Sequence, residues 1–249
     1  MLLQGKSAIV YGGGGAVGGA VSRAFAREGA RVFLAGRTAA SLEAVANAIR
    51  AAGGAAETAV VDALDERAVD AHADAVAAAA GGIDVSFCLV SQGDVQGTPL
   101  AEMTVADLMS PVETTVRAMF ITARAAARHM MRRRSGVILA FGGYGDPTPN
   151  VGGLQLAFGA AEALRRGLAR ELAPYGIRVL TIQTGGIPES IPPGMEGAEA
   201  ITEQLVGATM LGRTATLEDV GNVAAFAASD LARSMTATKL NITCGSEVD

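Results

Sequence analysis

The chain has 249 residues with a formal net charge of −5, and 50% of its residues are hydrophobic, which allows a substantial buried core. The mildly acidic balance argues against nucleic acid as a main partner, and no apolar stretch approaches the roughly 18 residues of a membrane span. The first residues lack the basic start and cleavage site of a secretory signal. The two cysteines, Cys88 and Cys244, provide neither a disulfide framework nor the spacing of a metal site. We therefore expect a cytoplasmic protein.

Apolar segments rich in β-branched residues alternate with longer amphipathic stretches along the chain. In chain order we predict strand 7–11, helix 16–28, strand 31–35, helix 41–52, strand 58–61, helix 66–80, strand 83–90, helix 112–134, strand 137–141, helix 154–173, strand 178–183, helix 217–229 and strand 240–243. Continuous apolar strands that alternate with helices are typical of a parallel sheet covered on both faces. We therefore expect a doubly wound α/β fold in a single domain spanning residues 1–249.

The segment 185–208 is rich in proline and glycine and follows the carboxyl end of a predicted strand. In doubly wound sheets, ligands bind at this edge. We therefore expect this segment to act as a lid over a substrate.

A glycine-rich turn, Tyr-Gly-Gly-Gly-Gly-Ala-Val-Gly at residues 11–18, joins the first predicted strand to the first predicted helix. Glycines at such a turn let the backbone approach a pyrophosphate, which the helix N-terminus also favours. A purely structural turn would use the same glycines. The context of strand, turn and helix favours a dinucleotide site that includes Gly12, Gly15, Ala16, Val17 and Gly18.

The ends of the second and third predicted strands carry charged residues. An acidic residue after the second strand would accept hydrogen bonds from the ribose of NAD, whereas Arg37 offers donors suited to a 2′-phosphate. Arg37 therefore favours NADP(H), with a solvated surface arginine as the alternative. Asp62 is placed either to contact the adenine amino group or to cap the next helix.

Several separated segments match one known family. Tyr11, Gly12, Ala16 and Gly18 stand at the positions of its Thr-Gly-x-x-x-Gly-x-Gly turn, and residues 171–179, 211–213, 218–220 and 228–230 match its later segments. The chain thus resembles the short-chain dehydrogenase/reductase family over nearly its whole length. The resemblance implies a Rossmann fold of about seven strands. It also places Thr184 and Gly185 at cofactor contacts and implies a homodimer or homotetramer formed through helices 112–134 and 154–173.

The family's catalytic positions hold other residues in this chain. The family's asparagine falls on Thr115, its serine on Gly142 or Gly143, its tyrosine on Leu154 and its lysine on Phe158. In the family, the tyrosine exchanges a proton with the substrate, while the lysine lowers the pKa of that tyrosine and binds the nicotinamide ribose. Leucine, phenylalanine and glycine supply none of these functions.

No shift of alignment restores that pair. The only lysines are Lys6 and Lys239, and neither follows a tyrosine by four residues. The usual acid/base machinery is therefore absent from this sequence.

Other side chains near the same sheet edge are candidates to replace this machinery. Tyr144 and Asp146 follow the fifth predicted strand and are our catalytic candidates, the alternative being that Tyr144 packs and Asp146 caps a turn before Pro147. His72 and His129 lie in helical stretches away from this edge, so we assign them no catalytic role.

We expect a mostly apolar substrate pocket. The fold would bring together polar candidates and apolar walls: Gln92, Asp94, Gly143, Tyr144, Leu154, Gln155, Phe158 and Glu189. The polar members have purely structural roles as alternatives. Apolar walls at Val90, Phe141, Leu154 and Phe158 favour a hydrophobic small-molecule substrate.

Two classes of function remain open from the sequence. In the first, the chain is a divergent enzyme that performs an unusual reduction, or a non-redox isomerisation, dehydration or cyclisation. In the second, it is a dinucleotide-binding sensor, or a silent subunit paired with an active relative. Calorimetric titration with NADPH and NADH tests the cofactor site that both classes share.

Overall fold

The computed structural model describes residues 1–142 and 149–248. Seven strands form one parallel sheet in the order β3-β2-β1-β4-β5-β6-β7. In chain order they are β1 (Ser7–Tyr11), β2 (Arg31–Gly36), β3 (Ala55–Val60), β4 (Val85–Cys88), β5 (Gly136–Gly142), β6 (Ile177–Gln183) and β7 (Lys239–Asn241). The predicted doubly wound α/β fold is confirmed.

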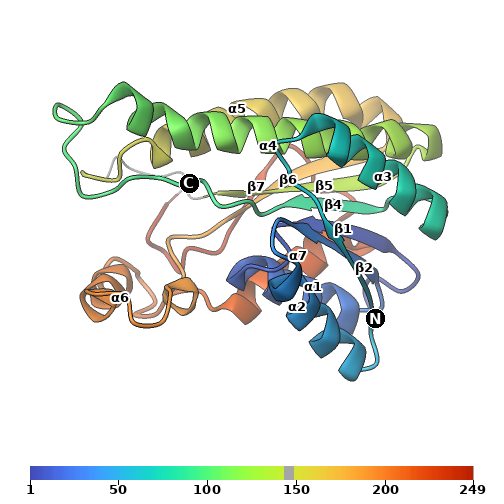
Figure 1. Ribbon diagram of the computed structural model, residues 1–249, viewed down its shortest axis with the longest axis horizontal. Helices are drawn as coiled ribbons and strands as arrows, with labels where there is room; N and C mark the ends of the chain where they lie inside the picture. The colour runs from blue at the N-terminus through green and yellow to red at the C-terminus, as the bar shows by residue number, and fades with distance from the viewer. Residues whose placement is uncertain (143–148, 249) are drawn as a thin grey trace.

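Helices cover both faces of this sheet. The helices are α1 (Ala16–Arg27), α2 (Ala39–Ala51), α3 (Glu66–Ala80), α4 (Val105–Arg133), α5 (Leu154–Leu172), α6 (Ala198–Gly207) and α7 (Leu217–Ala228). Figure 1 shows α3, α4 and α5 on one face and α1, α2 and α7 on the other. This layering creates two large hydrophobic clusters, one on each side of the sheet, and a smaller one of Met119, Ala140 and Ala161.

The central strand β1 explains why the sheet needs both layers. All five of its residues are buried. Ala8 and Val10 pack into the cluster beneath α1, α2 and α7, whereas Ile9 and Tyr11 pack into the cluster beneath α3 and α4. Successive side chains of a strand point to opposite faces, so a strand that is buried along its whole length must be covered on both faces.

Helix α4 begins at Val105, so the predicted start at residue 112 is wrong. Proline has no N–H to donate within a helix, so Pro111 is not expected inside one. The structure places Pro111 inside α4, buried, about two turns beyond a strong start signal. That signal is Thr104, whose hydroxyl accepts a hydrogen bond from Asp107 N at 3.1 Å.

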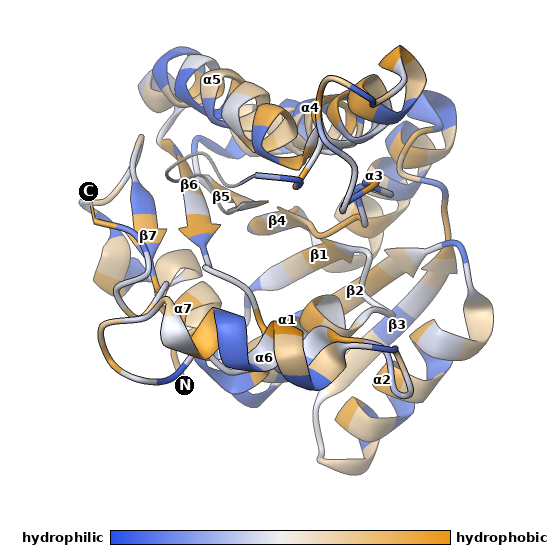
Figure 2. Cartoon of the chain, turned by 90° about the vertical axis from the view of Figure 1, so that its left-hand side faces the viewer, coloured by the Kyte–Doolittle hydropathy of each residue, from blue (hydrophilic) through white to orange (hydrophobic). Residues whose placement is uncertain are grey.

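The segment 185–208 contains a helix that the sequence did not predict. Helix α6 buries none of its residues, and Figures 1 and 2 show it projecting on the side where the strands end. The amphipathic pattern of α6 is short and lies within a segment rich in glycine and proline, so it did not predict a helix. Its Leu205 side chain lies against Gly186, directly after β6.

Across the residues that the structure describes, we find no helix with both the length and the apolarity needed to cross a bilayer.

Candidate functional site

The turn between β1 and α1 is tightly packed at its glycines. Gly12 has a φ of +81°, and a Cβ there would lie closer than 3.0 Å to the carbonyl oxygen of Leu89, which follows β4. A Cβ on Gly18 would likewise collide with the carbonyl oxygen of Gly12. The N–H of Gly12 donates to Ala35 O at 2.8 Å, which fixes the turn to β2. The turn therefore presents backbone, not side chains, at the N-terminus of α1.

A cavity of about 450 Å³ opens beside this turn, at the carboxyl ends of β1, β2 and β3. Among the residues that line it are Gly12, Gly15, Arg37, Asp62 and Gln92, which the sequence predicted for the cofactor or substrate site. The turn, the ends of two strands and the segment after β4 thus converge as the topology predicts.

Arg37 stands at this cavity without a partner among the described residues. Its side chain is exposed and forms no hydrogen bond or ion pair with the described part of the chain. Thr38 and Ser41 line the same cavity, although the sequence analysis did not select them. Thr38 and Ser41 follow Arg37 closely in the sequence, and this position could have been used to predict that they line the cavity. The Ser41 hydroxyl donates to Thr38 O at 3.0 Å, so the guanidinium of Arg37 and the hydroxyl of Thr38 are the donors that fit a phosphate group.

Asp62 lines the cavity but does not cap α3. Its carboxylate accepts from Leu64 N at 3.0 Å, whereas Asp65 is the N-cap and accepts from Arg67 N and Ala68 N. The alternative interpretation of Asp62 as the cap is therefore wrong. Its other carboxylate oxygen forms no hydrogen bond with the described residues.

A second cavity of about 330 Å³ adjoins the first, and the two share Gly15, Leu89, Val90, Ser91 and Gln92. Its walls come from the start of α1, the end of β4, the middle of α4 and the first half of α5. The residues that line it are Gly15, Ala16, Val17, Gly18, Cys88, Leu89, Val90, Ser91, Gln92, Thr115, Ala118, Met119, Ala140, Phe141, Phe158, Ala161 and Ser190. Burial raises the pKa of the Cys88 thiol, as expected for a small hydrophobic side chain.

Three of the residues that line this cavity occupy positions that the sequence assigned to the family's catalytic residues or to the lid. Phe158 lies where the family's lysine is expected, and Thr115 lies where its asparagine is expected. Ser190 belongs to the segment 185–208 and reaches the cavity after β6. The start of the expected lid is therefore in contact with this cavity.

Other candidates from the sequence do not line either cavity. Asp94 accepts a hydrogen bond from Gln96 Nε2 at 2.5 Å, and Leu154 and Gln155 form the first turn of α5. Glu189 accepts from Leu217 N at 2.8 Å, so its carboxylate lies at the N-terminus of α7.

The remaining candidates follow β5 and β6. Thr184 is buried and donates its N–H to Gly142 O at 3.0 Å, so Thr184 and Gly185 lie at the strand ends but line neither cavity. The catalytic candidates Tyr144 and Asp146, together with Gly143, lie outside the described residues.

Tyr11 occupies the space behind the glycine-rich turn. It is 1% exposed, and its hydroxyl lies 3.4 Å from His72 Nδ1 of α3. The two rings meet edge to face, with centroids 5.7 Å apart. Burial raises the pKa of the Tyr11 hydroxyl, so this tyrosine stays protonated and acts as a structural side chain.

The burial of His72 predicts a pH-dependent stability. Burial lowers the pKa of His72 in the folded chain, so the unfolded chain binds its proton more readily. The contribution of neutral His72 is therefore present above the unfolded value of about 6.5 and is lost as pH falls through it. We expect the urea midpoint of the wild type to fall more between pH 7.5 and pH 5.5 than that of His72→Phe. Equal losses in both proteins would contradict this assignment.

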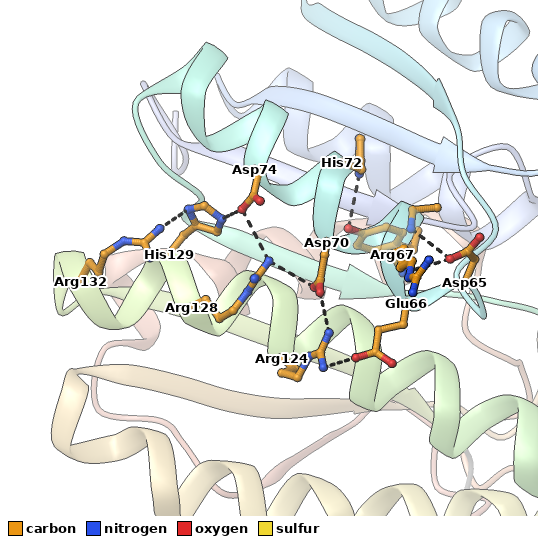
Figure 3. A network of polar contacts seen from close by, with 12 residues as sticks. Asp65, Glu66, Arg67, Asp70, His72, Asp74, Arg124, Arg128, His129 and Arg132 are labelled. Atoms are coloured by element: carbon orange, nitrogen blue, oxygen red, sulfur yellow. Dashed lines mark hydrogen bonds and ion pairs between the residues drawn. The ribbon is translucent and has the colours of Figure 1, made fainter.

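Ion pairs join α3 to α4 beside this tyrosine (Figure 3). Arg124 bridges Glu66 and Asp70, and Arg128 lies 3.2 Å from Asp70 and 3.5 Å from Asp74. Exposed pairs of this kind stabilise a fold only modestly, and a network does more than isolated pairs. The network fixes the position of α4, which forms one wall of the second cavity.

His129 and Arg132 extend the network along α4. His129 Nε2 lies 2.7 Å from Asp74, and its Nδ1 lies 2.8 Å from Arg132 (Figure 3). Both histidines of the chain thus take part in contacts between elements, away from the two cavities.

Comparison with known proteins places this geometry in a family. A family model described as enoyl-(acyl carrier protein) reductase matches residues 14–247. A gluconate 5-dehydrogenase from Gluconobacter oxydans is 29% identical over 91% of this chain and 89% of its own length. A crystal structure of NAD⁺-bound xylitol dehydrogenase has a TM-score of 0.89 and 26% identity over 98% of this chain and all of that chain. A short-chain dehydrogenase from Burkholderia cenocepacia in complex with NADP has a TM-score of 0.86 and 28% identity over 99% of both chains. The chain therefore belongs to the short-chain dehydrogenase/reductase family.

Proposed function

We propose that the chain binds NADP(H) in the first cavity and acts on a mostly apolar small molecule in the second, without the tyrosine–lysine proton relay of its family. The observation that carries this proposal is the unpaired Arg37, which lines the first cavity beside Thr38. Such a donor set recognises the 2′-phosphate that distinguishes NADP(H) from NAD(H). The related chain from Burkholderia cenocepacia was crystallised with NADP, which supports this choice.

The roles of the chain's residues follow from their positions. The backbone N–H groups of Ala16, Val17 and Gly18 at the N-terminus of α1 would hold the pyrophosphate, Arg37 the 2′-phosphate and Asp62 the adenine. NADP(H) supplies hydride chemistry when bound. Phe158 and the other apolar walls exclude water from the second cavity, which strengthens the hydrogen bonds made there.

Proton transfer needs groups other than those of the family. We propose Tyr144 as the proton carrier and Asp146 as its base or orienting partner. The same two groups would serve an unusual reduction or a non-redox isomerisation, dehydration or cyclisation. Closure of the segment 185–208 would sequester the substrate, and the contact of Ser190 with the second cavity supports this role.

Reversal of the charge at Arg37 tests the proposed cofactor. We expect Arg37→Asp to weaken NADPH binding about 100-fold, because a carboxylate would repel the 2′-phosphate that the guanidinium attracts. NADH binding should change by less than about threefold. Isothermal titration calorimetry with both nucleotides measures the difference.

The matched control is Arg233→Asp, which makes the same change in net charge. Arg233 is exposed and lines a separate hollow at the amino ends of the strands. Equal losses of NADPH affinity in the two variants would show that net charge, not a phosphate contact, is responsible. Absence of NADPH binding by the wild type would overturn the cofactor proposal.

A non-catalytic role is the second candidate, and one observation favours it. Phe120 of α4 and Leu156 of α5 are 46% and 51% exposed, on the two long helices that we propose as the surface for a homodimer or homotetramer. The same surface would pair this chain, as a silent subunit, with an active relative. Turnover by the purified chain alone would exclude this second candidate.

A further inference from the structure

The wall of the second cavity carries no charge among the residues that the structure describes. Apolar side chains such as Val17, Phe141 and Phe158 form much of it, and its polar members are neutral. Cys88 is the one titratable side chain on this described wall, and burial raises the pKa of its thiol. The thiol therefore stays protonated, and the described wall is neutral at physiological pH.

Two carboxylates next to this wall are already engaged elsewhere. Glu162 of α5 lies 2.9 Å from the guanidinium of Arg165. Glu189 precedes Ser190 of the wall, but its carboxylate accepts a hydrogen bond at 2.8 Å from the first backbone N–H of α7. Neither of these carboxylates is therefore placed to balance a positive charge inside the cavity.

The start of α1 adds a positive partial charge to the same wall. Ala16, Val17 and Gly18 line the cavity, and the first turn of this helix contains no acidic residue. An N-terminus of this kind is equivalent to roughly half a positive charge. It attracts the pyrophosphate, which the oxidised and reduced forms of a nicotinamide cofactor share, but it opposes a second positive group nearby.

The two cavities divide the cofactor between them. They adjoin, and they share Gly15 and residues 89–92. With the 2′-phosphate at Arg37 in the first cavity and the pyrophosphate at the start of α1, the nicotinamide half would extend into the second. The nicotinamide ring is positively charged in NADP⁺ and neutral in NADPH. Transfer of a charged ring from water to an uncharged wall costs free energy that a neutral ring does not lose.

We propose that the second cavity makes this chain selective for the oxidation state of its cofactor, so that it binds NADPH more tightly than NADP⁺. This inference rests on the proposed function, because it concerns the same cofactor. It goes further by assigning a preference between the two forms and by naming the uncharged wall as its cause. Such a chain fills its site with NADPH when both forms are present, whether it then delivers a hydride or only reports the ratio of the two forms.

Calorimetric titration of the wild type with NADPH and NADP⁺ measures this preference. We expect NADPH to bind about tenfold more tightly, which is the effect of one poorly compensated charge in a partly solvated site. Adenosine 2′,5′-bisphosphate is the reference ligand, because it lacks the nicotinamide half and reports on the first cavity alone. The wild-type ratio decides the proposal even where a variant fails to fold.

A charge introduced at Phe158 tests the cause of the preference. Phe158→Glu places a carboxylate on the wall, and at about pH 8, where this carboxylate is ionised, the preference for NADPH should fall about tenfold. Phe158→Gln has the same shape without the charge and should keep most of the preference. Ala163→Glu is the matched control for net charge, because Ala163 is exposed on the same helix and lines neither cavity. All three variants should bind adenosine 2′,5′-bisphosphate like the wild type.

Equal affinities of the wild type for NADPH and NADP⁺, or tighter binding of NADP⁺, overturn the proposal. An unchanged preference in Phe158→Glu, or an equal loss in Ala163→Glu, overturns the assignment to the uncharged wall. If the wild type binds both cofactors equally, this inference fails and the NADP(H) site stands. If it binds neither the cofactors nor the bisphosphate, the NADP(H) assignment itself fails.

Discussion

Replacement of Gly18 by alanine is expected to lower the free energy of unfolding by about 1–3 kcal/mol, as for other overpacked sites. The added Cβ would lie closer than 3.0 Å to the carbonyl oxygen of Gly12, and this obstacle is backbone. Gly12 cannot move aside freely, because it already lies against the carbonyl of Leu89. The strain therefore spreads through the turn to the N-terminus of α1, whose N–H groups would hold the pyrophosphate. We expect NADPH affinity to fall at least about tenfold.

Urea denaturation and NADPH titration measure the two effects of Gly18→Ala. The matched control is Gly207→Ala at the end of α6, where an added Cβ has no neighbour within 4 Å. That control should unfold like the wild type or slightly later, because alanine favours a helix more than glycine does. A Gly18→Ala protein with wild-type stability and NADPH affinity would show that the turn can relax and is not the nucleotide site.

The sequence predicted the elements best where local signals agree with packing. Strand Ser7–Tyr11 and helix Glu66–Ala80 have the predicted boundaries. The helix begins after Asp65, which caps it, and ends at Gly81 in a left-handed conformation. The predicted start of α4 was wrong, because the helix begins after the cap at Thr104 and continues through Pro111. Tertiary packing of Pro111 overrides the usual exclusion of proline from helix interiors.

The site was predictable where it depends on topology. Gly12 and Arg37 follow parallel strands, so they must meet at one edge of the sheet, and they line one cavity. Asp94 and Glu189 lie in longer loops, whose paths depend on contacts that the sequence does not encode locally. Thr115 shows the remaining limit, because its buried hydroxyl has no hydrogen-bond partner among the described residues, and this is visible only when every neighbouring group has been placed.

Tyr11→Thr restores the residue that the family carries at the start of its glycine-rich turn, and it is nevertheless expected to destabilise this chain by about 3 kcal/mol. Tyr11 is 1% exposed and packs between β1 and α3 with its ring edge to face with His72. Threonine would leave most of that ring's volume empty, and a rigid sheet and helix cannot close the gap fully. The midpoint of urea unfolding should therefore fall, with an unchanged slope.

Tyr11→Phe separates the volume of the ring from its hydroxyl. The hydroxyl lies 3.4 Å from His72 Nδ1, a long contact, so its loss should cost no more than about 1 kcal/mol. Similar losses in Tyr11→Thr and Tyr11→Phe would contradict the packing argument and assign the effect to the hydrogen bond. The expected ranking, with a large loss for threonine and a small one for phenylalanine, would mean that the core behind the turn has adapted to tyrosine. In that case threonine at position 11 would not be tolerated as a single substitution. A second substitution, to a larger side chain on α3, would be needed to fill the space.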